Sequence, residues 1–120
     1  GPFEVESALM EHAAVAEAAV VGVPDEKRHQ LVKAFVILKQ GEEPSRELAL
    51  DMFKHTIDIL AKFKIPRIIE FVTEVPKTLS GKIRRVELRE REIERQDGQA
   101  EAPAMEFYYW NFPELSSRKN

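Results

Sequence analysis

The sequence predicts a small α+β domain in which helices flank a three-stranded sheet. Residues 16–23 and 31–38 are two apolar runs of strand length, and a third run follows at 68–72. The segments around them show the spacing of amphipathic helices. The resulting order is helix, two strands, helix, strand, loop and helix, and 120 residues are sufficient for one such domain.

The N-terminal half supplies the first helix and a pair of strands. Apolar residues at helical spacing predict a short amphipathic helix at its start: Phe3, Val5, Ala8, Leu9 and His12. Residues 16–23 are apolar in both alternating sets apart from Glu17, so this strand should be covered on both faces. A loop of about seven residues separates it from the second strand, a length compatible with an antiparallel pair.

The C-terminal half supplies two further helices and the third strand. Ser45 is the predicted N-cap of a helix whose buried face is one apolar stripe. The stripe consists of Leu48, Met52, Phe53, Thr56, Ile57 and Leu60. Nine of the twelve residues 84–95 are charged, so the last helix should be largely solvated. The residues available to attach it to the domain are Val86, Leu88 and Ile93.

Composition excludes several classes of function. The net charge is −3, and the Arg84–Arg85 pair is followed by glutamates, so the chain lacks an electrostatic footprint for nucleic acid. It contains no cysteine, which excludes disulfides and fits a reducing compartment, and we expect a cytoplasmic protein. The three scattered histidines form no metal-binding pattern, and no apolar run approaches the ~20 residues that span a bilayer.

The segment 76–85 carries the strongest functional signal. It places Lys82 directly after Gly81, between an apolar strand and a charged helix. Glycine permits a sharp turn, and the lysine ammonium is a compact charge suited to phosphate or carboxylate oxygens. The alternative is a solvated surface lysine. A nucleotide P-loop is excluded, because Pro76 stands at its first glycine position and Ile83 replaces its hydroxyl residue.

Together with its flanks, this segment resembles the C-terminal signature of the acyl- and aryl-CoA synthetases, which are adenylate-forming, AMP-binding enzymes. The signature Pro-x-x-x-x-Gly-Lys matches Pro76, Gly81 and Lys82. Further stretches similar to family motifs are 1–6, 20–25, 32–36 and 63–72, the last being closest to medium-chain acyl-CoA synthetases. The resemblance covers residues 1–95 and implies the mobile C-terminal domain of such an enzyme. Because the first residues are similar to the end of a hinge motif, we expect the native chain to begin earlier.

The resemblance implies a two-step ligation. A carboxylic acid attacks the α-phosphate of ATP to give acyl-AMP and pyrophosphate, and CoA then converts acyl-AMP to the thioester. Lys82 would be the catalytic residue that offsets the repulsion of two anions, with Ser80 and Gly81 forming the substrate and nucleotide loop. ATP with its Mg²⁺ and the acyl pocket would belong mainly to a larger N-terminal domain, so this domain would be inactive alone. The implied setting is fatty acid metabolism.

The resemblance further implies that the domain rotates about its hinge and presents another face to CoA. Arg28 is the candidate CoA-binding residue by position, since arginine stacks on bases and binds phosphate, and a solvated loop arginine is the alternative. Two departures from the family pattern concern this step. His29 stands where glycine is usual, and Ile57 stands where the medium-chain branch often has a lysine that touches CoA. Lys82 is also the family's target of reversible acylation, which would remove its charge.

Residues 96–120 fall outside the resemblance and read as a linker, 96–103, followed by an aromatic tail, 104–120. The tail holds five of the ten aromatic residues: Phe107, Tyr108, Tyr109, Trp110 and Phe112. At about 25 cal/mol per Å² of apolar surface, this area should be buried, either on this domain or by docking to another domain or subunit. An alternative to the ligase is a non-catalytic binding module of the same fold, with this tail as its interface. A carrier-protein-loading adenylating enzyme is a further alternative, but such relatives more often have asparagine where this chain has Ser80.

Overall fold

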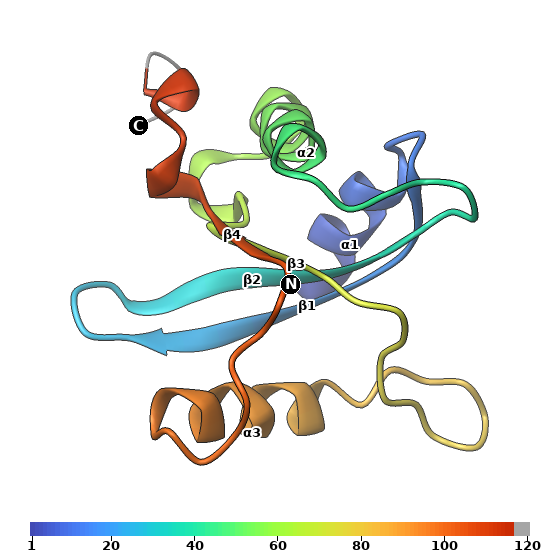
Figure 1. Ribbon diagram of the computed structural model, residues 1–120, viewed down its shortest axis with the longest axis vertical. Coiled ribbons are helices and arrows are strands. Elements are labelled where there is room, and N and C mark those ends of the chain that lie inside the picture. Colours follow the sequence, from blue (N-terminus) through green and yellow to red (C-terminus); the bar gives the residue numbers. More distant parts are fainter. Residues whose placement is uncertain (117–120) are drawn as a thin grey trace.

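One mixed β-sheet lies between two layers of helices in the computed structural model, which describes residues 1–116 (Figure 1). The elements are α1 Pro2–Met10, β1 Val15–Asp25, β2 His29–Leu38, α2 Arg46–Ile59, β3 Ile68–Phe71, α3 Arg85–Gln96 and β4 Glu106–Tyr108. Three 3₁₀ turns are η1 Lys62–Lys64, η2 Tyr109–Asn111 and η3 Pro113–Leu115. Helices α1 and α2 cover one face of the sheet and α3 covers the other. The predicted α+β class with flanking helices is confirmed.

The strand order is β1-β2-β3-β4. β1 and β2 form a long antiparallel pair, as predicted, whereas β3 lies parallel to β2. Parallel neighbours require a crossover connection, which α2 and η1 provide. Ser45 caps α2 as predicted, because its Oγ accepts a hydrogen bond from the N–H of Leu48 at 3.0 Å. The chain that leaves the end of β3 then carries the lysine loop.

The predicted seven-residue loop between the first two strands is wrong, because only residues 26–28 separate β1 from β2. The Asp25 carboxylate accepts the N–H of Lys27 at 3.1 Å and that of Arg28 at 2.9 Å, which closes a tight turn. His29 then adopts a φ of 63°, in the left-handed region that favours glycine. Side-chain hydrogen bonds therefore let both strands continue into residues that the sequence analysis assigned to the loop.

Both faces of β1 are buried, as its apolar pattern predicted. On one face, Val20 belongs to a core cluster with Leu9 of α1 and Phe53 of α2. On the other face, Val21 belongs to a smaller cluster with Leu88 of α3. The sheet is therefore the shared wall of two apolar cores.

The sheet has four strands and not the three predicted, because the aromatic tail supplies β4. β4 pairs antiparallel with β3, with Ile69 opposite Phe107. Beyond β4, the rings of Tyr109 and Phe112 pack against Phe53, with centroids 5.7 and 5.4 Å apart respectively. Of the two alternatives for the tail, residues 106–115 follow the first, which is burial on this domain's own sheet and helices.

Helix α3 is attached to the sheet differently from the prediction. Leu88 is 1% exposed, but Val86 is 62% and Ile93 is 40% exposed. The second buried residue of the helix is Glu92, whose carboxylate pairs with the buried Lys33 of β2. One apolar anchor and a buried ion pair therefore replace the three apolar contacts that were expected.

Candidate functional site

The predicted lysine loop is a closed hairpin that follows β3. Lys77 and Ile83 pair as an isolated antiparallel bridge, and the N–H of Thr78 donates to the carbonyl of Lys82 at 2.8 Å. The N–H of Gly81 donates to the carbonyl of Thr78 at 2.9 Å. Gly81 has a φ of 88°, which other residues rarely adopt. The sequence therefore places glycine where the backbone requires it.

Short polar side chains stabilise the tip of this hairpin. The hydroxyl oxygens of Thr78 and Ser80 lie 3.1 Å apart, and the Thr78 hydroxyl accepts the N–H of Lys82 at 3.1 Å. Leu79 is fully exposed between them. The candidate loop residue Ser80 thus helps to shape the turn.

Lys82 differs from the neighbouring cations in having no carboxylate partner among residues 1–116. Lys77 pairs with Glu17 of β1 at 2.8 Å, and Arg84 pairs with Glu87 at 2.7 Å. The side chain of Lys82 is exposed, and no ion pair between described residues includes it. Its ammonium is therefore available to an anionic ligand.

A buried carboxylate joins the far end of the hairpin to the first helix. Glu6 of α1 is 6% exposed and accepts two hydrogen bonds from the Arg85 guanidinium, at 2.5 and 2.9 Å. The same carboxylate accepts the N–H of Val20 in β1 at 2.8 Å. Arg85 also lies over the ring of Phe3, 4.8 Å from its centroid. The hairpin is consequently anchored to both α1 and the sheet.

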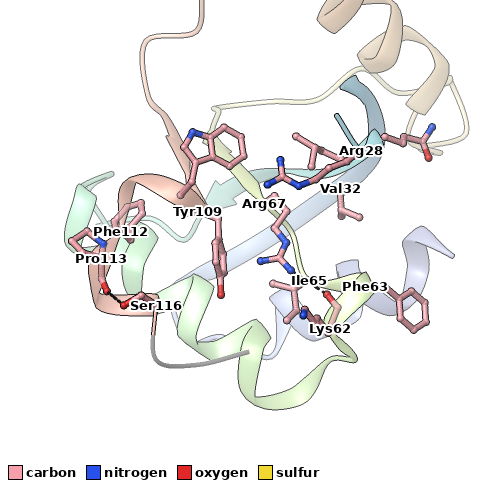
Figure 2. A pocket seen from close by; sticks show the side chains of 13 residues that line it. Arg28, Val32, Lys62, Phe63, Ile65, Arg67, Tyr109, Phe112, Pro113 and Ser116 are labelled. Carbon is pink, nitrogen blue, oxygen red and sulfur yellow. Dashed lines mark hydrogen bonds between the residues drawn. The ribbon is translucent and has the colours of Figure 1, made fainter. Parts of the chain in front are cut away.

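Arg28, the candidate CoA-binding residue, lies in the β1–β2 turn and lines a pocket of about 560 Å³ (Figure 2). Two further cations line the same pocket, Lys62 of η1 and Arg67 just before β3. The Arg67 guanidinium lies 4.3 Å from the centroid of Tyr109, and that of Arg28 lies 5.9 Å from the centroid of Trp110. The structure thus joins Arg28 to groups that the sequence analysis had not connected with it.

The lysine hairpin and the Arg28 pocket are separate sites on this domain, because neither Ser80 nor Lys82 lines the pocket. Of the two departures from the family pattern, Ile57 is 2% exposed and belongs to the main core. His29 is exposed beside Arg28 in the turn. Ile57 therefore packs inside the domain and offers no surface contact to a ligand.

A buried ion network that was not predicted from the sequence lies beneath α3. Lys33 of β2 is fully buried, and its Nζ lies 2.8 Å from Glu70, 2.6 Å from Glu92 and also in contact with Glu106. Arg95 of α3 pairs with Glu70 and Glu92, each at 2.7 Å. Three carboxylates and two cations thereby connect β2, β3, α3 and β4.

Tyr108 of β4 extends this network by donating its hydroxyl hydrogen to Glu106. Burial, the hydrogen bond to Glu106 and the surrounding carboxylate charges together raise the pKa of the Tyr108 hydroxyl well above its ordinary value. The phenol therefore stays protonated and acts as a hydrogen-bond donor that holds β4. This arrangement has a structural role and lies apart from the lysine hairpin.

Two further features are absent from residues 1–116. No group of three or more His, Cys, Asp or Glu side chains in that range is arranged to hold a metal ion. None of the helices within it has both the length and the apolar character needed to cross a membrane.

Known proteins show the same domain in several ligases. The AMP-binding enzyme C-terminal domain family matches residues 4–82. The 4-hydroxybutyrate–CoA ligase 1 of Metallosphaera sedula is 66% identical over 95 residues, which are 79% of this chain and 17% of that protein. The mitochondrial acyl-coenzyme A synthetase ACSM1 of Homo sapiens is 50% identical over 94 residues, covering 77% of this chain and 16% of that protein.

Solved structures agree with this assignment. The acyl-CoA synthetase of Brucella canis superposes with a TM-score of 0.78 at 56% identity, covering 80% of this chain and 18% of that chain. The anthranilate CoA ligase AuaEII, in complex with anthranoyl-AMP, gives a TM-score of 0.73 at 49% identity over 76% of this chain and 18% of its own. The chain thus spans less than a fifth of the length of these relatives. The resemblance expected from the sequence is confirmed, and the chain belongs to the AMP-binding enzyme C-terminal domain family, whose relatives here are acyl-CoA ligases.

Proposed function

We propose that this chain is the lysine-bearing domain of an ATP-dependent acyl-CoA synthetase. Such an enzyme joins a carboxylic acid to CoA and converts ATP to AMP and pyrophosphate. The observation that carries the proposal is the exposed Lys82 ammonium, which has no carboxylate partner among residues 1–116 and sits on a hydrogen-bonded turn. The partner of this domain would be a larger N-terminal domain of the same enzyme, without which it would be inactive.

The first step is the one that requires Lys82. A carboxylate oxygen attacks the α-phosphorus of ATP, a new P–O bond forms, and the bond to pyrophosphate breaks. Because both reactants are anions, a cation between them lowers the barrier, and it acts more strongly in a water-poor site than in bulk water. Ser80 and Gly81 shape the turn that presents the ammonium. We assign the acyl pocket, most ATP contacts and the accompanying Mg²⁺ to the larger domain.

The second step would use the face that carries Arg28. The thiol of CoA loses its proton, its sulfur attacks the acyl carbonyl, and the bond to AMP breaks. Rotation of the domain between the steps would withdraw the lysine hairpin and bring Arg28 to CoA. The side chain of Arg28 is 59% exposed, so it is accessible to a phosphate group of CoA.

The proposal is tested by ATP–pyrophosphate exchange with a panel of carboxylic acids in the full-length enzyme. Lys82→Ala should reduce exchange ~10²–10³-fold, because it removes one preorganised charge, and should leave acyl transfer from supplied acyl-AMP to CoA nearly unchanged. Lys39→Ala is the matched control, since Lys39 is another exposed lysine and lies outside the hairpin. Exchange at the wild-type rate in Lys82→Ala would refute the catalytic role.

The binding-module alternative has less support than the ligase. Tyr109 and Phe112 were candidates for a docking interface, but both are buried against this domain.

The carrier-protein alternative is tested by identifying the thiol that accepts the acyl group. A CoA ligase forms acyl-CoA from free CoA, whereas a carrier-loading enzyme acylates the thiol of a carrier protein.

Reversible acylation of Lys82 is a further part of the proposal. The side chain is exposed, so a modifying enzyme has access to it, and acylation would remove the charge required in the first step. Mass spectrometry that finds acyl-Lys82 together with lost pyrophosphate exchange would support this regulation. Full exchange by the acylated enzyme would contradict it.

The domain bounds, the location and the metabolic setting complete the proposal. We propose that residues 1–95 form the family's domain and that 96–120 form a linker and an aromatic tail. A cytoplasmic location and a role in fatty acid metabolism stay predictions, and fractionation and the acid panel test them.

A further inference from the structure

Glu6 of α1 is a carboxylate buried where three elements of the fold meet. It is 6% exposed, and it accepts the N–H of Val20 in β1 and two N–H groups of Arg85 in α3. A buried carboxylate is costly unless it is paired and hydrogen-bonded, and both of its oxygens are occupied here. Arg85 is the first residue of α3, where the helix dipole disfavours a cation, so the carboxylate also offsets that position.

The short connection from Arg85 back to Lys82 is held by hydrogen bonds. Ile83 belongs to the antiparallel bridge of the hairpin, and the N–H of Arg84 donates to the carbonyl of Pro76 at 2.9 Å. These contacts join the hairpin to the first residue of α3 without a free segment between them. A shift of the Arg85 guanidinium should therefore move the base of the hairpin, and the Lys82 ammonium with it.

The two ion pairs that attach the hairpin differ in strength. The side chains of Lys77 and Glu17 are 40% and 30% exposed, so water and salt weaken their attraction. The Arg85 guanidinium instead meets the buried Glu6 through two N–H groups, which fixes orientation as well as distance. The ring of Phe3 lies 4.8 Å from that guanidinium. The buried fork therefore determines where the base of the hairpin lies.

We propose that Glu6 is a positioning residue, which places the Lys82 ammonium through Arg85. Glu6 is buried behind the arginine and acts through it, so it is not itself a catalytic residue. The inference rests on the proposed function, because the charge that is placed is the one assigned to adenylation. Accurate placement matters there, since a displacement of about 1 Å at a reacting group can cost ~10²-fold in rate.

The test is ATP–pyrophosphate exchange in the full-length enzyme. Glu6→Gln keeps the size of the side chain and removes its charge, and it should slow exchange about 10–100-fold. Arg85→Lys keeps the charge and loses the fork, so it should show a similar loss and carries the test if Glu6→Gln does not fold. In the Lys82→Ala background, either change should cost less than about twofold more, because the charge that it places is gone. Acyl transfer from supplied acyl-AMP to CoA should stay near the wild-type rate.

Glu92→Gln is the matched control. Glu92 is 7% exposed and also pairs with a buried cation, Lys33, but it does not contact the hairpin. It should lower the urea midpoint as Glu6→Gln does, and it should leave exchange within about twofold of the wild type. Wild-type exchange in both Glu6→Gln and Arg85→Lys, or their full loss again in the Lys82→Ala background, would overturn the positioning role.

A second measurement separates this inference from the proposed function. In the 120-residue chain, Glu6→Gln should speed amide hydrogen exchange at Thr78 and Arg84 about tenfold, and Glu92→Gln should not. Unchanged protection at both amides would show that Glu6 does not hold the hairpin. Wild-type pyrophosphate exchange in Lys82→Ala would instead refute the proposed function, and the amide rates would still decide whether Glu6 places the hairpin.

Discussion

Replacing Lys33 by methionine tests whether the buried ion network holds the tail on this domain. The Lys33 ammonium is fully buried and contacts Glu70, Glu92 and Glu106. Arg95 remains beside Glu70 and Glu92 in the variant, so Glu106 is the carboxylate that loses its cation. Breaking a buried pair by removing one partner costs about 3–5 kcal/mol, which is a large share of the ~5–15 kcal/mol that stabilises a typical domain.

Urea unfolding of the chain measures this loss. With an m-value of about 1.5 kcal/mol/M, Lys33→Met should lower the midpoint by roughly 2–3 M. Glu106→Gln removes the charge that this change leaves unpaired, so the double variant should be more stable than Lys33→Met alone. Lys39→Met, at an exposed lysine just after the same strand, should stay within about 0.5 kcal/mol of the wild type.

The result that would refute this reasoning is a Lys33→Met midpoint equal to that of Lys39→Met. The network would then contribute no net stability. Strictly additive effects of Lys33→Met and Glu106→Gln would instead show that the two side chains do not interact, contrary to their contact in the structure.

Three further predictions concern single residues. The side-chain hydrogen bond from Arg46 is the largest of the causes that lower the pKa of Glu114 to about 2. The stability that this contact contributes is therefore fully present above the ordinary carboxyl pKa, and it is lost as the pH falls from about 4 to 2. An NMR titration of Glu114 should find that midpoint, Arg46→Gln should return it toward 4.5, and an unshifted wild-type midpoint would contradict the contact. Ser45→Ala should lower the free energy of unfolding by about 1 kcal/mol, whereas Ser45→Asp keeps the N-cap, and equal losses in urea would count against capping. The backbone at His29 is in the left-handed region, which glycine adopts easily and valine does not. His29→Gly should therefore leave the free energy of unfolding unchanged or raise it by up to about 1 kcal/mol, and His29→Val should lower it by about 1–2 kcal/mol. The reverse order of urea midpoints would argue against this conformation.

Features that depend on neighbours in the sequence were predicted well. Ser45 caps α2 and Gly81 adopts a positive φ as expected, because both effects are decided within a few residues. The apolar runs gave β1, β2 and β3, since burial of a strand on both faces leaves a direct trace in composition. The hairpin with Lys82 also formed between the third strand and the last helix, where the motif placed it.

Features that depend on distant partners were missed. Lys33 pairs with Glu92 and Glu106, which are 59 and 73 residues away in the sequence. The sequence of a strand does not indicate whether its lysine contacts water or distant carboxylates. β4 has only three residues, too few for a visible alternation, and pairing with the available edge of β3 makes it a strand. The pocket around Arg67 was missed for the same reason, because its walls come from three separate segments of the chain.

The anchoring of the lysine hairpin at both ends has a mechanical consequence. Before the turn, Lys77 is tied to Glu17 in β1, and after it, Arg85 is tied to Glu6 in α1, the helix nearest to the N-terminal end. If the domain rotated about that end, the ammonium of Lys82 would move with it, and the turn that carries Lys82 would keep its shape. The position of the Lys82 ammonium would then follow the orientation of the domain as a whole and not local loop motion.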